Sequence, residues 1–232
     1  MTSPAAPFEI VFPIFPRVTQ LDFTGPHQVL SRTPNSRVTV ASLGGQEIAA
    51  EGMVFAGLAD LARVERCDLL CVPGGLGAVE AMLDPVFVRE IRRLGEGARY
   101  VTSVCTGSLI LAAAGLLAGR RAACHWAWRD LLAPFGVLAD PGRVVRDGRF
   151  VTGGGVTAGL DFAFALLAEI AGPDYAQGVQ LGLEYAPQPP FDAGRPETAP
   201  AHVLAAYRRL LEPLGAGRRA AAQEAASRLL PA

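Results

Sequence analysis

Short apolar runs bounded by Gly and Pro alternate along this chain with longer stretches in which apolar positions recur every three or four residues. The short runs predict buried strands, and the periodic stretches predict helices. We expect strands at Phe8 to Ile14, Arg37 to Leu43, Asp68 to Val72 and Tyr100 to Val104, a hairpin over Ile48 to Phe55, and helices near Leu21 to Leu30, near Val86 to Gly95 and after Cys105. This alternation predicts an α/β three-layer sandwich, in which helices cover both faces of a mostly parallel sheet.

The second half of the chain continues the same pattern. Asp147-Gly148 lies between two β-branched runs within 143–152, which is typical of a hairpin. Three glycines from Gly153 then lead into a helix that we expect from Val156 to about Ala171. Gly172-Pro173 follows directly and predicts the end of this helix.

The C-terminal part is expected to be an extension rather than a second domain. Residues 186–200 are rich in Pro and predict little regular structure, and a last amphipathic helix should run from about 201 to 230. We interpret its Arg208-Arg209 and Arg218-Arg219 pairs as a solvated helix face, because the segment is short for a paired helix-turn-helix domain. The expectation is therefore one domain over 1–232 with a C-terminal helical extension.

Composition and charge limit the partners to expect. The chain has 232 residues, half of them hydrophobic, and a formal net charge of −1. A near-neutral charge gives no electrostatic reason to expect a nucleic acid or membrane partner. The N-terminus lacks the basic and apolar regions of a secretory signal, and no apolar stretch is long enough to span a bilayer. We therefore expect a cytoplasmic protein.

Four cysteines are too few for a disulfide framework in a chain of this length and favour a reducing compartment. Cys67 and Cys71 lie in an apolar, strand-like run, and no second Cys or His cluster completes a metal site. We interpret these two and Cys124 as packing residues. His125 is interpreted as structural, because nothing in the sequence brings it to a nucleophile.

Cys105 differs from the other cysteines, because a β-branched run ends at it and an apolar helical run begins after it. A strand that enters a helix through such a turn projects this side chain beside the free N–H groups of the helix. The positive end of a helix favours thiolate, so we expect a lowered pKa for Cys105 and a nucleophilic role. The N–H of Thr106 is then a candidate oxyanion donor, and its hydroxyl a candidate to orient substrate or water.

Two further loops follow predicted strands and should reach the same edge of the sheet. Asp22 lies in the first, where it is either a helix N-cap or an acid. The second contains Gly74, Gly75 and Leu76, which form a candidate substrate or oxyanion loop, with a plain turn as the alternative. Its spacing fits neither a P-loop nor a dinucleotide-binding motif.

Five stretches resemble the PfpI-like superfamily, whose members have a class I glutamine amidotransferase-like fold, and within it the isocyanide hydratases most closely. These stretches are Gln20 to His27, Val72 to Gly75, Val101 to Ser108, Gly153 to Asp161 and Leu183 to Gly194. The resemblance covers nearly the whole chain. It implies a flavodoxin-like domain and a homodimeric enzyme that adds water to an organic isocyanide to give the N-substituted formamide, without a metal or organic cofactor.

The resemblance also implies roles for individual residues. Cys105 would be the nucleophile that forms a covalent thioimidate, Asp22 the general acid and base, and Thr106 an orienting neighbour. Val156 would lie near the nucleophile, at a position where the family commonly has Ile.

Two other functions stay open at this point. A glyoxalase- or peptidase-like enzyme of the same superfamily would use the same cysteine. Peptidase relatives, however, place His where this chain has Thr106, and glyoxalase relatives carry Glu where it has Asp22. The alternative from another class is a ligand-binding module related to transcriptional regulators, which attach a helix-turn-helix domain after this fold.

Overall fold

The computed structural model describes residues 6–229, which are built around one seven-stranded sheet. Its strands are β1 (Phe8–Pro13), β2 (Ser36–Ser42), β5 (Ala59–Asp60), β6 (Leu69–Val72), β7 (Tyr100–Val104), β10 (Val144–Asp147) and β11 (Phe150–Gly153). They lie in the order β10-β11-β7-β6-β1-β2-β5, and every neighbouring pair is parallel except β10 and β11. The predicted α/β fold with a mostly parallel sheet is confirmed.

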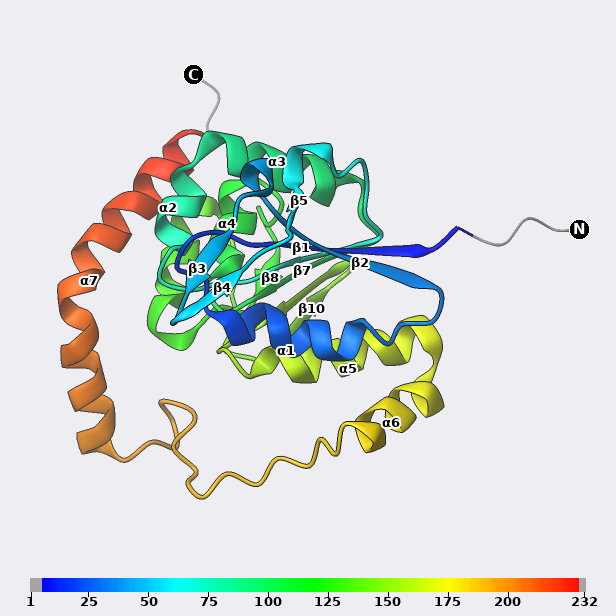
Figure 1. Cartoon of the computed structure of the whole chain (residues 1–232). Helices are drawn as coiled ribbons and strands as arrows, with labels where there is room; N and C mark the ends of the chain where they lie inside the picture. The colour runs from blue at the N-terminus through cyan, green and yellow to red at the C-terminus, as the bar shows by residue number, and fades with distance from the viewer. Residues whose placement is uncertain (1–5, 230–232) are drawn as a thin grey trace, which may run out of the picture.

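Helices form the two outer layers (Figure 1). The α-helices of the described residues are α1 (Gln20–Leu30), α2 (Ala78–Leu83), α3 (Pro85–Gly97), α4 (Gly107–Ala113), α5 (Ala158–Ala171), α6 (Pro173–Gly182) and α7 (Ala201–Ser227). Helices α1 and α5 pack together on one face of the sheet, and α2, α3 and α4 pack together on the other. Each face of the sheet is therefore covered, as its continuous apolar strands require.

Short strands and 3₁₀ helices lie in the loops of this sandwich. They are the hairpin β3 (Ile48–Ala50) and β4 (Met53–Phe55), the paired strands β8 (Arg121–Ala122) and β9 (Leu138–Ala139), and the 3₁₀ helices η1 (Leu43–Gly45), η2 (Leu61–Arg63) and η3 (Trp126–Phe135). The expected elements are present within two residues of their predicted bounds, except the last helix, which ends at Ser227, whereas its expected end at about 230 lies outside the described residues. The helix expected from Val156 begins at Ala158, because the Gly155 carbonyl closes a turn with the Ala158 N–H at 2.8 Å.

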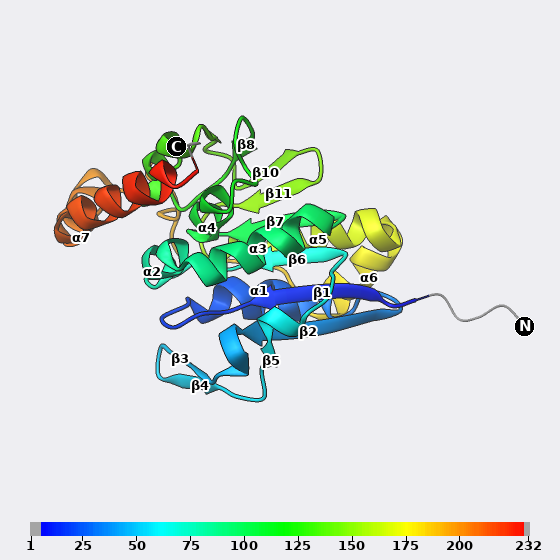
Figure 2. The same ribbon diagram turned by 90° about the horizontal axis from the view of Figure 1, so that it is seen from above.

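Helix α7 lies outside the two helical layers (Figures 1 and 2). The chain leaves α6 and crosses the irregular segment 186–200 before α7 begins, as the Pro-rich composition predicts. Helix α7 then packs against η3, α2 and α4. Within residues 6–229, no helix combines the length and the apolar character that a membrane crossing needs.

The parallel strands bring several loops to one edge of the sheet. Asp22 follows β1, Gly74 follows β6, Cys105 follows β7 and Gly154 follows β11. These four strands are neighbours at the centre of the sheet. The loop ends that carry candidate chemistry therefore meet at the carboxyl edge, where open α/β sheets bind ligands.

Candidate active site

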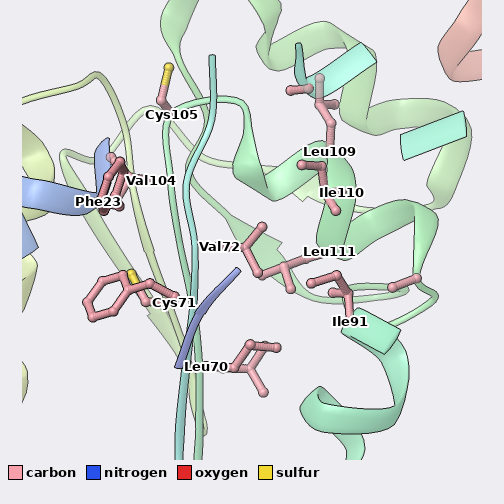
Figure 3. Close-up of a cluster of buried hydrophobic side chains, with 14 of the residues drawn as sticks. Phe23, Leu70, Cys71, Val72, Ile91, Val104, Cys105, Leu109, Ile110 and Leu111 are labelled. Carbon is pink, nitrogen blue, oxygen red and sulfur yellow. The ribbon is translucent and has the colours of Figure 1, made fainter. Parts of the chain in front are cut away.

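Cys105 forms the turn between β7 and α4 and has a φ of +57°. This left-handed conformation is strained for a side chain with a Cβ, and it is retained where the surroundings fix it. The Cys105 N–H donates to the Gly153 carbonyl at 3.1 Å, which ties the turn to β11. Cys105 stands at one end of the apolar cluster that fills the core, with its sulfur directed away from the cluster (Figure 3). The predicted nucleophile elbow is thus present.

Asp22 lies in the first turn of α1 and is completely buried. Thr19 is the N-cap residue, so Asp22 does not cap the helix. Its Oδ2 accepts a hydrogen bond from the Gly74 N–H at 2.9 Å, while Oδ1 has no well-aligned partner among residues 6–229. Burial raises the pKa of Asp22 to about 7, against lowering contributions from the Gly74 N–H and the neighbouring Cys105 thiol. The carboxyl can therefore be protonated near neutral pH.

The Thr106 side chain joins the glycine loop, Gly74 to Leu76, to the elbow at Cys105. Its hydroxyl accepts from the Gly75 N–H at 2.9 Å and donates to the Gly75 carbonyl at 3.1 Å. Gly74 and Gly75 are buried beside Asp22 and Thr106, whereas the Leu76 side chain is 52% exposed. The N–H groups of Gly74 and Gly75 are both bonded within the protein. The Thr106 N–H, in contrast, interacts with Cys105, where it stabilises the thiolate.

The expected low pKa of Cys105 is wrong for this folded state. Burial and the negative charge of Asp22 raise the pKa of the Cys105 thiol well above its usual value, and the Thr106 N–H and hydroxyl lower it by less. Helix α4 has seven residues and supplies a positive end too weak to outweigh the loss of solvation. The thiol and the Asp22 carboxyl therefore form a coupled pair.

The remaining cysteines and His125 lie outside the group formed by Cys105, Asp22 and Thr106. Burial raises the pKa of Cys67, Cys71 and Cys124 to about 12, in line with their interpretation as packing residues. His125 Nδ1 accepts from the Ala127 N–H at 3.3 Å and so caps η3. In the part of the chain that the structure describes, no hydrogen bond joins His125 to Cys105. The structural interpretation of His125 fits this geometry.

A cavity of about 220 Å³ adjoins this region. It is lined by Cys124, His125, Val156 and the Gly154-Gly155 turn, and by Arg195 from the irregular segment 186–200. Because Gly153 accepts the hydrogen bond of the elbow, Val156 lies only three residues from a direct contact of Cys105. The side chain at 156 can therefore influence the space beside the nucleophile.

One buried side chain of α7 is not expected from the sequence. Arg218 of α7 is 7% exposed, whereas Arg219 is exposed, so the interpretation of both as a solvated face is wrong for Arg218. Its guanidinium carbon lies 4.0 Å from the centroid of the Trp128 ring. The helical spacing in the sequence indicates this burial, because Arg218 lies on the same stripe of α7 as Ala222 and Ala225, which are also buried.

Three comparisons relate this chain to known proteins. Residues 9–169 match the DJ-1/PfpI family. The chain is 48% identical to isonitrile hydratase of Pseudomonas putida over 208 residues, which cover 88% of this chain and 90% of that protein. It is also 30% identical to Protein dj-1beta of Drosophila melanogaster, over 72% of this chain and 92% of that protein.

The chain belongs to the DJ-1/PfpI family. A solved structure of a THiJ/PfpI family protein from Pseudomonas syringae superposes on it with a TM-score of 0.89 at 37% identity, covering 95% of this chain and 91% of that one. The predicted resemblance to PfpI-like proteins is confirmed. The match to the DJ-1/PfpI family ends at residue 169, inside α5, so α6, the irregular segment and α7 lie beyond it.

The candidate site has no room for a side chain at Gly74. A Cβ there would lie 2.4 Å from the Thr106 nitrogen, 2.6 Å from its hydroxyl oxygen and 2.9 Å from Asp22 Oδ2. We expect Gly74→Ala to displace the acid and the elbow together and to lower the turnover of substrate by about 100-fold or more. Steady-state kinetics on the substrate measures this loss.

Gly178→Ala is the matched control, because a Cβ at Gly178 meets nothing within 4 Å. This variant should keep the wild-type rate. Wild-type activity in Gly74→Ala would show that the loop does not hold the acid in place.

The buried Asp22 carboxyl predicts a pH-dependent stability. Its pKa is about 7 in the folded protein and 3.8 without the fold, so stability falls as the pH rises between these values. Asn cannot ionise. We therefore expect Asp22→Asn to gain about 2 kcal/mol of stability relative to the wild type between about pH 5 and about pH 8. Urea unfolding at the two pH values measures the difference. If the free energy of unfolding changed equally with pH in the two proteins, Asp22 would not be a neutral buried acid.

Proposed function

We propose that this chain is an isocyanide hydratase, which adds water to the terminal carbon of an organic isocyanide and releases the N-substituted formamide. The observation that carries the proposal is the pairing of Cys105, strained in a nucleophile elbow, with the buried acid Asp22. The 48% identity to the isonitrile hydratase of P. putida, across most of both chains, supports the choice of substrate.

In the first step, Asp22 takes the proton of the Cys105 thiol. The resulting thiolate attacks the terminal carbon of the isocyanide, which is electrophilic toward a soft sulfur nucleophile. This carbon then carries an electron pair that must be protonated at once, and Asp22 returns the proton to it. The product of the step is a thioimidate, Cys105–S–CH=N–R, which holds all atoms of the thiol and the isocyanide.

In the second step, the Asp22 carboxylate removes a proton from water as the water attacks the thioimidate carbon. Asp22 passes this proton to the imine nitrogen, which gives the tetrahedral intermediate Cys105–S–CH(OH)–NHR. The C–S bond then breaks and Cys105 leaves as thiolate, with the Thr106 N–H stabilising the charge on sulfur, while the proton of the hydroxyl group passes to Asp22. The formamide leaves, and Asp22 and Cys105 again share one proton. Sulfur, acid and the chain's own backbone supply every group that these steps use.

A pKa near 7 suits both duties of Asp22. An acid that is half-protonated at the working pH can deliver a proton in one step and accept one in the next. The coupled pair also holds only one negative charge, which limits the cost of burying it.

The rival functions use the same fold with different chemistry. Thr106 stands where peptidase relatives carry His, and its hydroxyl is occupied with the Gly75 backbone. An HTH-type transcriptional regulator of Pseudomonas aeruginosa, CdhR, matches 57% of this chain at 33% identity, but these matched residues make up only 40% of that protein. Neither observation favours a second function over the hydratase.

The test is a panel of aryl and alkyl isocyanides, followed by detection of the formamides, with methylglyoxal and an operator-length DNA duplex as the rival ligands. Formamide production with no DNA shift supports the proposal. Consumption of methylglyoxal in place of every isocyanide would refute the substrate and leave only the nucleophile.

The chain is further proposed to work as a single-domain subunit of a homodimer in the cytoplasm, with no nucleic acid or membrane partner. Four free cysteines fit a reducing compartment. Large apolar side chains that are more than two-thirds exposed on the subunit, namely Leu181, Phe191 and Leu210, fit burial against a second copy.

A further inference from the structure

The cavity of about 220 Å³ that adjoins the candidate site is lined by more cations than anions. Three arginines belong to its lining, namely Arg129 of η3, Arg143 and Arg195. Glu197 is the one carboxylate among the described residues that line it. Arg143 is already neutralised, because it forms an ion pair with Asp161. Arg129 and Arg195 then stand against Glu197, which leaves an excess of one positive charge.

Arg129 carries a charge that the fold leaves unpaired. Its Nε is buried and has no hydrogen-bond partner, and none of the hydrogen bonds or ion pairs within residues 6–229 involves its side chain. The charge of Arg129 also reaches Asp140, but this carboxylate accepts from Arg121 at 2.7 Å and from the Gly142 N–H at 2.8 Å. A partly buried guanidinium without a hydrogen bond is costly, so the structure favours an anion that enters the cavity.

The other titratable groups around the cavity do not supply this anion. Burial and the nearby arginines lower the pKa of His125, so its imidazole is neutral. Burial raises the pKa of the Cys124 thiol to about 12, so it is neutral as well. Asp130 is exposed and lines a different cavity. The N-cap residue of α5, Thr157, belongs to the lining, so the positive end of this helix adds to the attraction for an anion.

The size and the charge of the cavity indicate which anion fits. Its volume of about 220 Å³ is several times the share of one water, about 30 Å³, but smaller than the pockets of about 300–1,000 Å³ that enclose a whole drug-sized ligand. It therefore suits one end of a small molecule. One excess positive charge matches a monoanion, and the planar fork of a guanidinium matches a carboxylate.

The cavity is joined to the elbow by two short backbone connections. Gly154 lines the cavity and directly follows the carbonyl that accepts the Cys105 N–H at 3.1 Å. Cys124 lines it too and follows Ala123, whose carbonyl accepts the Ser108 hydroxyl of α4 at 2.5 Å. A substrate whose reacting carbon lies at the elbow can therefore extend its other end toward the cavity.

We propose that this cavity receives a carboxylate of the substrate, with Arg129 as its main partner and the exposed Arg195 as the second cation. The substrate class is then an organic isocyanide that carries a carboxylate at its other end. Glu197 disfavours a dianion such as a phosphate ester in the same place. The inference deepens the proposed function and rests on it for the isocyano group.

The first test is a calorimetric titration with 4-formamidobenzoate, the hydration product of 4-isocyanobenzoate, and with its uncharged methyl ester. Arg129→Met removes the charge and keeps an unbranched side chain, whereas Arg129→Lys keeps the charge. Arg209→Met is the matched control, because Arg209 is exposed on α7 and does not line the cavity. Near-ultraviolet circular dichroism establishes that each variant is folded.

We expect the wild type to bind the carboxylate about tenfold or more tightly than the ester, because a charge-assisted hydrogen bond forms with the carboxylate alone. Arg129→Met should lose this preference, Arg129→Lys should keep part of it, and Arg209→Met should match the wild type. Equal binding of acid and ester by the wild type, or an undiminished preference in Arg129→Met, would overturn the inference. If Arg129→Met does not fold, an undiminished preference in Arg129→Gln has the same force.

Steady-state kinetics then connects the cavity with the reaction. The wild-type kcat/KM for 4-isocyanobenzoate should exceed that for its methyl ester about tenfold, and Arg129→Met should remove this difference through KM, with kcat nearly unchanged. Hydration of both isocyanides with equal kcat/KM would support the proposed function and refute the carboxylate site. Arg129-dependent binding of 4-formamidobenzoate by a protein that hydrates neither isocyanide would support the site and refute the isocyanide as substrate.

Discussion

Cys105→Ala is expected to lose isocyanide hydration by at least about 10⁴-fold, because the covalent intermediate cannot form without the sulfur. The fold should survive, since the substitution removes one atom at the end of the apolar cluster and the elbow is held by the Gly153 carbonyl. The measurement is formamide production by the purified variant under single-turnover and steady-state conditions. Cys105→Ser should be nearly as inactive, because a hydroxyl is a far weaker nucleophile at neutral pH.

Cys67→Ala is the control for this substitution. Cys67 is a free, buried cysteine whose sulfur lies 3.9 Å from the Leu94 carbonyl oxygen, outside the site. Its loss should leave the rate close to that of the wild type. Substantial turnover by Cys105→Ala would mean that water attacks the isocyanide directly.

Asp22→Asn is expected to lower turnover by about 10²–10⁴-fold, the usual contribution of a general acid and base. The amide can still accept the hydrogen bond of the Gly74 N–H, so the loop should keep its place. In the wild type, turnover should depend on an ionisation near pH 7, because burial raises the pKa of Asp22 to about 7. A pH–rate profile of both proteins tests whether this ionisation disappears with the carboxyl.

Glu51→Gln controls for the loss of a nearby negative charge, since the Glu51 carboxylate raises the pKa of Asp22 without belonging to the site. This variant should stay active, with its profile moved to lower pH. An Asp22→Asn protein that keeps both the rate and the profile of the wild type would exclude Asp22 as the acid.

The elbow and its surroundings could be predicted because they follow from local sequence. A β-branched run that ends at Cys105, with an apolar helical run after it, specifies a strand, a turn and a helix. Parallel strands then bring the residues that follow them to one edge, which places Asp22 and Gly74 near Cys105 without knowledge of any contact.

The ionisation of Cys105 could not be predicted in the same way. The helix N-terminus is visible in the sequence, but the loss of solvation depends on how completely α1 and the glycine loop cover the sulfur. That cover reverses the direction of the pKa shift. Local sequence therefore indicates the candidate nucleophile and gives the wrong direction for the shift of its pKa.

Arg218 shows a second limit of local sequence. A pair of arginines on an amphipathic helix is usually solvated, and only the packing of α7 on η3 makes one of them buried. The spacing to the buried Ala222 and Ala225 indicates the buried stripe, but it does not reveal the contact of Arg218 with Trp128.

The covalent thioimidate is the central claim of this account, and its mass tests it most directly. Asp22→Asn should still form the adduct slowly and hydrolyse it more slowly still, so the intermediate should accumulate when the variant is mixed with an aryl isocyanide. Intact-protein and peptide mass spectrometry should then find Cys105 heavier by the mass of one isocyanide, with no addition in Asp22→Asn that also carries Cys105→Ala. Formamide release by the wild type, with no adduct on Cys105 in either protein at any time, would contradict the covalent mechanism.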